Sequence, residues 1–181
     1  MTRQTPLLGA DEPAPYEVID VEPAHAALIV CDHAANRIPA ALQDLGVSPA
    51  DLTTHFAVDI GAGDVARHLS RRLRLPAVLA CYSRLVVDCN RALNDPSAFP
   101  VFMEHMMVPG NQTLDHAARR ARAEALYWPY HHGVRDQIMR LAAGGLAPPL
   151  IAIHSFTPVF DGSERPWHIG VLWDKDPRLP V

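Results

Sequence analysis

The chain has 181 residues, of which 49% are hydrophobic and 20% charged, a composition typical of a soluble globular protein. Its formal net charge of −4 provides no basic face that could neutralise phosphates, so we expect no nucleic-acid partner. No apolar run reaches the ~18 residues of a membrane-spanning helix and no signal-peptide core is present, which favours a cytoplasmic protein without membrane contact. Residues 1–15 are expected to be a loose lead-in, and residues 16–181 to form a single domain.

The first predicted strand is the continuous apolar run AALIVC, Ala26 to Cys31. The next predicted element is a helix from Gly61 to Leu73. Within it, Val65, Leu69 and Leu73 recur at four-residue intervals, which predicts that these three side chains form one buried stripe.

The remaining elements follow in the second half of the chain. A helical pattern runs from Thr113 to about Ala143, and Pro129 is expected to break or kink it. Four apolar runs are predicted to be strands: PAVLACY (Pro76 to Tyr82), RLVVDC (Arg84 to Cys89), LIAI (Leu150 to Ile153) and HIGVLW (His168 to Trp173). Several of the predicted strands lack the polar alternation of a sheet with one wet face, so helices should cover both faces. The predicted fold is an α/β three-layer sandwich with a mixed, mostly parallel sheet.

Polar residues follow three of the predicted strands directly. His33 lies just beyond the first strand, Asn90 and Arg91 follow RLVVDC, and His154 and Ser155 follow LIAI. Because ligands bind at the carboxyl ends of strands in open α/β sheets, we expect these residues to contribute to one site.

His33 and His154 suit a metal site with three protein ligands and an open position for water. The third ligand could be Asp59, although an Asp immediately before a helix could equally cap it. Either histidine could instead bond to loop backbone in a structural role. The donor set admits zinc or another divalent metal.

Two arginines flank the predicted RLVVDC strand. An extended strand of this length would keep Arg84 and Arg91 too far apart to touch one group together. Asn90 and Arg91 could bind a substrate carboxylate, since the guanidinium presents a planar fork of donors. Arg91 could otherwise pair with Asp88 or Asp95 at the surface.

Five segments together resemble the N-formylglutamate amidohydrolase family, in its shorter branch. They are LIVCDHAANRIPAAL, VDIGAGDVARHL, YSRLVVDCNR, PYHHGV and IAIHSFTPVFDGSERPWHIGVLW, in this order between Tyr16 and Val181. The resemblance implies a fold like that of the zinc carboxypeptidases.

By position, the resemblance implies that His33 and His154 are metal ligands and that Asn90 and Arg91 clamp the substrate carboxylate. It makes Arg84 a candidate for stabilising the oxyanion. Asp59 matches an acidic position of the amidohydrolases. Asn36 stands where carboxypeptidases place a glutamate ligand, but an amide is a poor zinc ligand, so Asp59 is preferred.

The implied activity is metal-dependent hydrolysis of the amide bond of an N-formyl or other N-acyl amino acid, such as N-formylglutamate. Arg84 and His154 are the expected catalytic residues, and Asn90, Arg91 and Ser155 are expected to bind the substrate. Family members continue into a late strand with a Glu that is expected to act as general base, and this chain lacks that part. Two alternatives follow: a binding module that retains only the carboxylate clamp, or a fragment whose unpaired sheet edge favours homo-oligomers.

Overall fold

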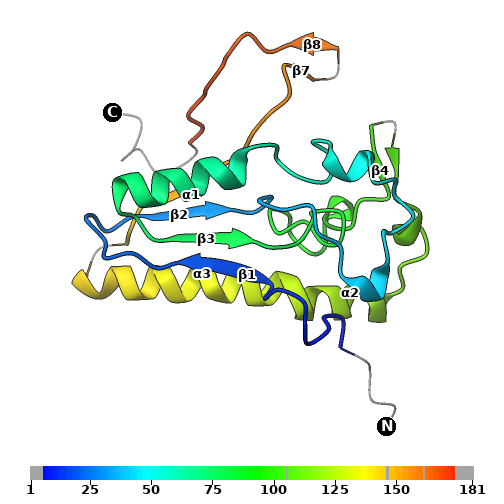
Figure 1. Ribbon diagram of the computed structural model, residues 1–181, viewed down its shortest axis with the longest axis horizontal. Helices are drawn as coiled ribbons and strands as arrows, with labels where there is room; N and C mark the ends of the chain where they lie inside the picture. Colours follow the sequence, from blue (N-terminus) through cyan, green and yellow to red (C-terminus); the bar gives the residue numbers. More distant parts are fainter. Residues whose placement is uncertain (1–5, 105, 146, 161, 174–181) are drawn as a thin grey trace.

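The computed structural model describes residues 6–104, 106–145, 147–160 and 162–173 (Figure 1). Its centre is a four-stranded sheet in the order β1-β3-β2-β6. The strands are β1 (Tyr16–Ile19), β2 (Leu28–Cys31), β3 (Ala77–Ala80) and β6 (Leu150–Ala152). β2 runs parallel to both β3 and β6, and β1 pairs antiparallel with β3. The sheet is therefore mixed and mostly parallel, as predicted.

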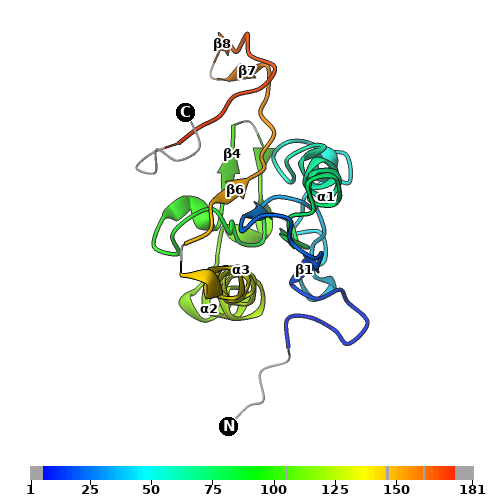
Figure 2. The same cartoon turned by 90° about the vertical axis from the view of Figure 1, so that its left-hand side faces the viewer.

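Each face of the sheet is covered by one long helix. Ile29 and Leu79 face α1 (Ala62–Leu73), whereas Leu28 and Val78 face α3 (Trp128–Leu141). The two helices lie on opposite sides of the strands in Figure 1, and the view turned by 90° in Figure 2 also shows the strands between α1 and α3. Because both faces of β2 and β3 are buried, these strands read as continuous apolar runs.

The predicted apolar stripe of α1 is wrong. Val65 is 49% exposed and Leu73 46% exposed, and of the three residues Leu69 alone is partly buried against the core. The side of the helix that packs on the sheet carries the buried residues Ala62, Ala66 and Ser70. Small side chains let the helix backbone approach the strands closely, so the helix buries its smallest residues rather than its largest.

A π-turn interrupts the long helical segment. Asp115 caps α2 (His116–Arg122) by accepting a hydrogen bond from the amide of Ala118. The π-turn η5 (Ala123–Tyr127) follows, and Pro129 lies in the first turn of α3. The break or kink expected near Pro129 takes the form of this π-helical turn. The helical backbone continues from α2 into α3, and the amide of Trp128 bonds to the carbonyl of Ala123 just before the proline, which has no amide proton to donate.

RLVVDC is not a strand. The segment Ser83–Cys89 folds into turns, with the amide of Val86 bonded to the carbonyl of Ser83 at 3.0 Å. Leu85 and Val86 are fully buried in a second core formed with Phe99 and its neighbours. An apolar run signals burial, and here burial occurs in a loop packed against other loops rather than in a sheet.

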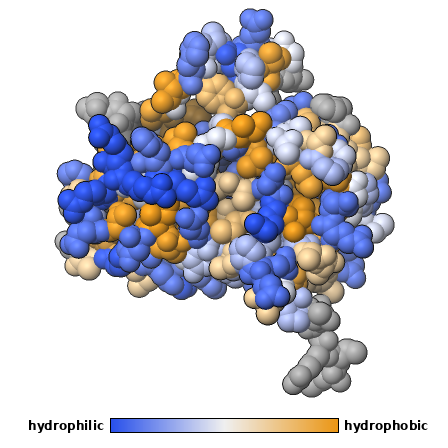
Figure 3. Space-filling view, in the orientation of Figure 1, coloured by the Kyte–Doolittle hydropathy of each residue, from blue (hydrophilic) through white to orange (hydrophobic). Residues whose placement is uncertain are grey.

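HIGVLW is not a strand either. Ile169 is 84% exposed and Leu172 99% exposed, and the segment pairs with no strand within the described residues. The surface in Figure 3 shows apolar patches among polar side chains, consistent with such exposed hydrophobic residues.

Part of the expected lead-in packs on the body of the protein. Leu7 and Leu8 contact the second core, and the Tyr82 hydroxyl donates to the carbonyl of Pro13 at 2.8 Å. Residues 1–5 lie outside the described part of the chain. No helix of that part has the length and apolar character needed to cross a membrane.

The remaining short elements connect these parts. The strands are β4 (Phe102–Met103), β5 (Met106–Met107), β7 (Val159–Phe160) and β8 (Ser163–Glu164), which form two small hairpins. The short helical turns are η1 (Ala40–Leu42), η2 (Asp51–Thr53), η3 (Pro96–Ala98), η4 (Pro109–Asn111) and η6 (Ala142–Gly144).

Candidate metal centre and adjoining pocket

Two histidines meet at the carboxyl ends of neighbouring parallel strands. His33 follows β2 and His154 follows β6, and the amide of Ile153 bonds to the carbonyl of Val30 at 2.9 Å, which extends the pairing toward the site. The two imidazole rings lie 5.3 Å apart. Asp59 is held beside His33 by its backbone amide, which donates to the carbonyl of His33 at 3.1 Å. The structure thus brings these three residues together, with one potential ligand atom from each within 4.8 Å of the others.

Both histidines present the same nitrogen to Asp59. Asp59 Oδ2 lies 3.4 Å from Nδ1 of His33 and 2.8 Å from Nδ1 of His154. The opposite nitrogens face other carboxylates: Nε2 of His33 lies 2.8 Å from Asp88, and Nε2 of His154 lies 3.4 Å from Asp32. In metal sites a carboxylate commonly holds the far nitrogen of a ligating histidine, which fixes the tautomer and turns the other nitrogen toward the ion.

The free nitrogen of His33 fits a metal ligand. His33 is 2% exposed, and its buried Nδ1 makes no hydrogen bond within the described part of the chain. Its 3.4 Å separation from Asp59 Oδ2 is close to the roughly 3.3 Å between two ligand atoms that each lie ~2.0–2.1 Å from a tetrahedral zinc ion. His33, Asp59 and His154 are therefore suitable to hold a divalent metal.

The structure distinguishes the two candidates for the third metal ligand, Asp59 and Asn36. The carboxylate of Asp59 makes no capping bond to α1, whose N-cap is Gly61, so the side chain is directed to the histidines. Asn36 is exposed, and its amide donates to the carbonyl of Leu52 at 2.8 Å, outside this group.

The charges of the site are strongly coupled. Contact with Asp32 and then with Asp59 raises the pKa of His154 to about 9. Burial opposes protonation of His33, but Asp59 and Asp88 outweigh burial and raise its pKa. Burial would raise the pKa of Asp59, yet the hydrogen bond to His154 and the nearby imidazole of His33 hold this pKa well below its usual range. Carboxylates and imidazoles thus alternate in the site, and each kind of group favours the charged form of the other.

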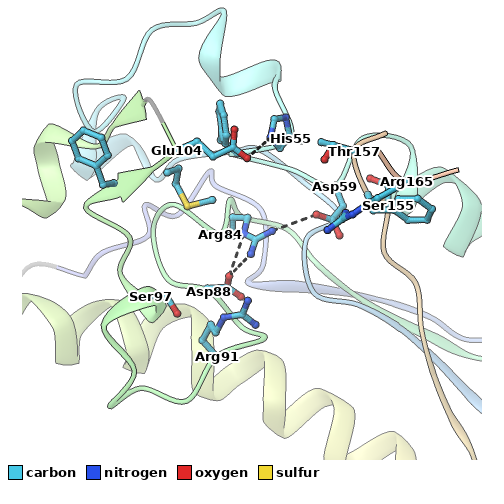
Figure 4. Close-up of a pocket in the computed structure, with 14 residues that line it drawn as sticks. His55, Asp59, Arg84, Asp88, Arg91, Ser97, Glu104, Ser155, Thr157 and Arg165 are labelled. Atoms are coloured by element: carbon cyan, nitrogen blue, oxygen red, sulfur yellow. Dashed lines mark hydrogen bonds and ion pairs between the residues drawn. The ribbon is translucent and has the colours of Figure 1, made fainter. Parts of the chain in front are cut away.

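Arg84 bridges two acids of the site. Its Nη2 donates to Asp88 at 2.8 Å and its Nη1 lies 3.5 Å from Asp59, as Figure 4 shows. The turns of Ser83–Cys89 bring Arg84 and Asp88 together. An extended strand would have separated them, so the predicted extended spacing of this segment is wrong.

Buried side chains from other elements support this loop. Asn111 donates to the carbonyl of Leu85 at 2.8 Å, and Arg122 donates to that of Val86 at 3.1 Å. Arg122 also donates to the side chain of Asn111 at 2.6 Å. The loop that carries Arg84 is therefore held in place by η4 and α2.

A cavity of about 360 Å³ opens beside the cluster (Figure 4). Asp59, Arg84, Arg91 and Ser155 line it, and Asn90 is exposed next to it and is not part of the lining. Both arginines thus border one cavity, contrary to the separation expected for an extended strand. The volume suits a small organic ligand.

Arg91 remains available on this wall of the cavity. Its guanidinium donates to the carbonyl of Asn90 at 2.9 Å and, within the described residues, forms an ion pair with neither Asp88 nor Asp95. The surface ion pair considered as an alternative for Arg91 is therefore not formed.

The opposite wall contains residues that sequence reasoning missed. Glu104 lies at the tip of the β4–β5 hairpin with a positive φ of 49°, and its carboxylate is 3.9 Å from Nε2 of His55. Arg165 also lines the cavity, with its guanidinium 5.8 Å from the ring centre of Phe156. Phe156 and Arg165 lie in the segment IAIHSFTPVFDGSERPWHIGVLW, whereas nothing in the local sequence marked His55 or Glu104.

Comparisons with known proteins identify the family of the chain. The family model of N-formylglutamate amidohydrolase matches residues 25–181. The crystal structure of gene product Atu2144 from Agrobacterium tumefaciens is 41% identical in sequence, with a TM-score of 0.91 over 96% of this chain and 69% of that chain. The search of curated proteins returned no match. Because the family model matches far more than half of the chain, the chain belongs to the N-formylglutamate amidohydrolase family.

Proposed function

We propose that the chain is a metal-dependent amidohydrolase that cleaves the amide bond of an N-formyl or other N-acyl amino acid, with N-formylglutamate as the first candidate. Family membership indicates a hydrolase of amide bonds. The observation that carries the metal dependence is the convergence of Nδ1 of His33 and of His154 on one oxygen of Asp59, with the free nitrogen of His33 buried. The proposal includes a three-layer sandwich of the zinc-carboxypeptidase type and a cytoplasmic location.

In this proposal, His33, Asp59 and His154 hold zinc or another divalent ion. When bound, such an ion polarises the amide carbonyl and lowers the pKa of a water molecule to about 7. Asp88 keeps His33 oriented, since it occupies Nε2 and leaves Nδ1 free.

The arginines have separate tasks. Arg91, with Asn90 beside it, binds the carboxylate of the substrate through two parallel hydrogen bonds. Arg84 is fixed by Asp88 and borders the cavity, so it can stabilise the negative charge that develops on the carbonyl oxygen without reorganising. Ser155 lines the same cavity and contacts the substrate.

The test is hydrolysis of a panel of amino-acid derivatives by the purified protein. N-formyl-, N-acetyl- and unmodified glutamate are incubated with the zinc-loaded protein and with protein stripped by a chelator, and release of the free amine is measured. We expect turnover of an N-acyl compound only by the loaded protein. Binding of the compounds by calorimetry without any product would favour the binding module instead.

A further inference from the structure

A buried hydrogen-bond chain connects helix α3 to the candidate metal centre. The Tyr130 hydroxyl donates to Asp32 Oδ1 at 2.6 Å, and Asp32 Oδ2 lies 3.4 Å from Nε2 of His154. Tyr130 is 1% exposed and the side chain of Asp32 is 12% exposed. Tyr130 approaches the site from the face of the sheet opposite α1, and neither Tyr130 nor Asp32 belongs to the proposed ligand set or lines the cavity.

The direction of each hydrogen bond in this chain is determined by its chemistry. Burial and the adjacent Asp32 raise the pKa of Tyr130 well above its usual value, so the hydroxyl keeps its proton and donates. The two oxygens of Asp32 have separate partners: Oδ1 accepts from the Tyr130 hydroxyl at 2.6 Å, and Oδ2 faces Nε2 of His154 at 3.4 Å. Asp32 is therefore an acceptor on both sides, and Nε2 of His154 must carry the proton between them.

This arrangement matters because a neutral imidazole has a single free lone pair. If Nε2 holds the proton toward Asp32, the lone pair lies on Nδ1, which faces Asp59 at 2.8 Å. If the proton moved to Nδ1, the nitrogen that faces the cluster could no longer bind a metal. His154 needs such control more than His33 does, since its side chain is 34% exposed and it follows the edge strand β6.

We propose that Tyr130 and Asp32 are positioning residues that hold His154 with its Nδ1 directed at the metal site. The inference rests on the proposed metal-dependent function. Tyr130 fixes the carboxylate of Asp32, and Asp32 fixes the tautomer and ring orientation of His154. Neither residue touches the substrate or the ion.

Metal affinity of the full chain tests the relay independently of turnover. Zn²⁺ is titrated in competition with a chromophoric chelator, and Co²⁺ is added to a second sample to record the visible absorption that reports ligand geometry. The variants are Tyr130→Phe, which removes only the hydroxyl, and Asp32→Asn, whose amide can donate to Nε2 and favour the wrong tautomer. Tyr82→Phe is the matched control, because it also removes a hydroxyl of a buried tyrosine that donates at 2.8 Å, but to the carbonyl of Pro13 and not to a residue of the cluster.

We expect Tyr130→Phe to weaken Zn²⁺ binding about tenfold and Asp32→Asn roughly 100-fold, each with an altered Co²⁺ spectrum, whereas Tyr82→Phe matches the wild type. If Tyr130→Phe does not fold, Asp32→Asn decides alone. Wild-type affinity and spectrum in both variants would overturn the relay and leave the proposed function standing. A wild-type protein that binds neither metal would overturn the proposed function and the relay with it.

Discussion

The two histidines of the cluster face the same carboxylate from different surroundings. His33 follows the central strand β2, is 2% exposed, and is fixed by Asp88, which Arg84 holds in turn. His154 follows the edge strand β6, and its side chain is 34% exposed. One side of the site is thus part of the folded core, and the other lies at its margin.

The difference in burial predicts that the two histidines contribute differently to the stability of the fold. A buried charged cluster is costly to break, because each removed partner leaves another charge unpaired. A half-exposed histidine can lose its partner to water at little cost. The His33 side should therefore support both folding and metal binding, whereas the His154 side should matter mainly for metal binding.

The largest effect expected on this basis comes from His33→Ala. It removes one of the two basic side chains that lie between the buried carboxylates of Asp59 and Asp88 and leaves only Arg84 there, so we expect a loss of about 3 kcal/mol in the free energy of unfolding. His154→Ala is the matched variant, with an expected loss of about 1 kcal/mol or less. Urea unfolding of the metal-free proteins, followed by circular dichroism, measures both. Equal losses would mean that the two sides are not distinct.

Arg84→Met should have an intermediate effect on stability and a strong effect on catalysis. Asp88, whose side chain is 3% exposed, loses two hydrogen bonds from the guanidinium, which should cost about 2 kcal/mol. Loss of the oxyanion partner should lower kcat about 100-fold.

Arg91→Met is the control for Arg84, because Arg91 lines the same cavity but is exposed and bonds only to a backbone carbonyl among the described residues. We expect KM to rise about tenfold with kcat and stability nearly unchanged. A fall in kcat with unchanged KM would show that Arg91 does not act on the substrate carboxylate.

The smallest effect concerns the pH dependence of the metal-free protein. Because Asp32 and Asp59 raise the pKa of His154 to about 9 from 6.5, its protonated form stabilises the fold fully below pH 6.5, and this stabilisation is lost as pH rises through 9. The melting temperature should fall over this window, and the melting temperature of His154→Gln should fall less. An identical alkaline slope in His154→Gln would assign that slope to other groups.

On the acid side, burial opposes but His33 and Arg84 favour the charged form of Asp88, and its pKa is lowered to about 2. Its contribution to stability is therefore lost only as pH drops below about 4 toward 2, in both proteins.

The parts of the site that sequence predicted best are those at the ends of regular strands. His33 and His154 follow apolar runs that do form neighbouring parallel strands, so general sheet topology was enough to bring them together. Glu104 and His55 could not be foreseen, because their approach depends on the path of a hairpin and a loop rather than on a local pattern.

Two apolar hexapeptides show the limit of pattern alone. RLVVDC and HIGVLW carry the same strand signal, yet the first is buried in turns and the second is exposed and forms no strand. A run of apolar residues indicates a tendency to be buried, but a strand also needs a neighbour with free hydrogen-bonding groups. In the loop that carries Arg84, the backbone carbonyls instead accept hydrogen bonds from the side chains of Asn111 and Arg122, which come from distant parts of the chain.

The central claim is that His33, Asp59 and His154 hold a metal ion, and elemental analysis tests it most directly. The full chain and a His33→Ala, His154→Ala double variant are purified identically, incubated with zinc and freed of excess ion. We predict about one zinc per chain in the wild type and none in the double variant. Zinc bound equally by both proteins, or by neither, would contradict the account.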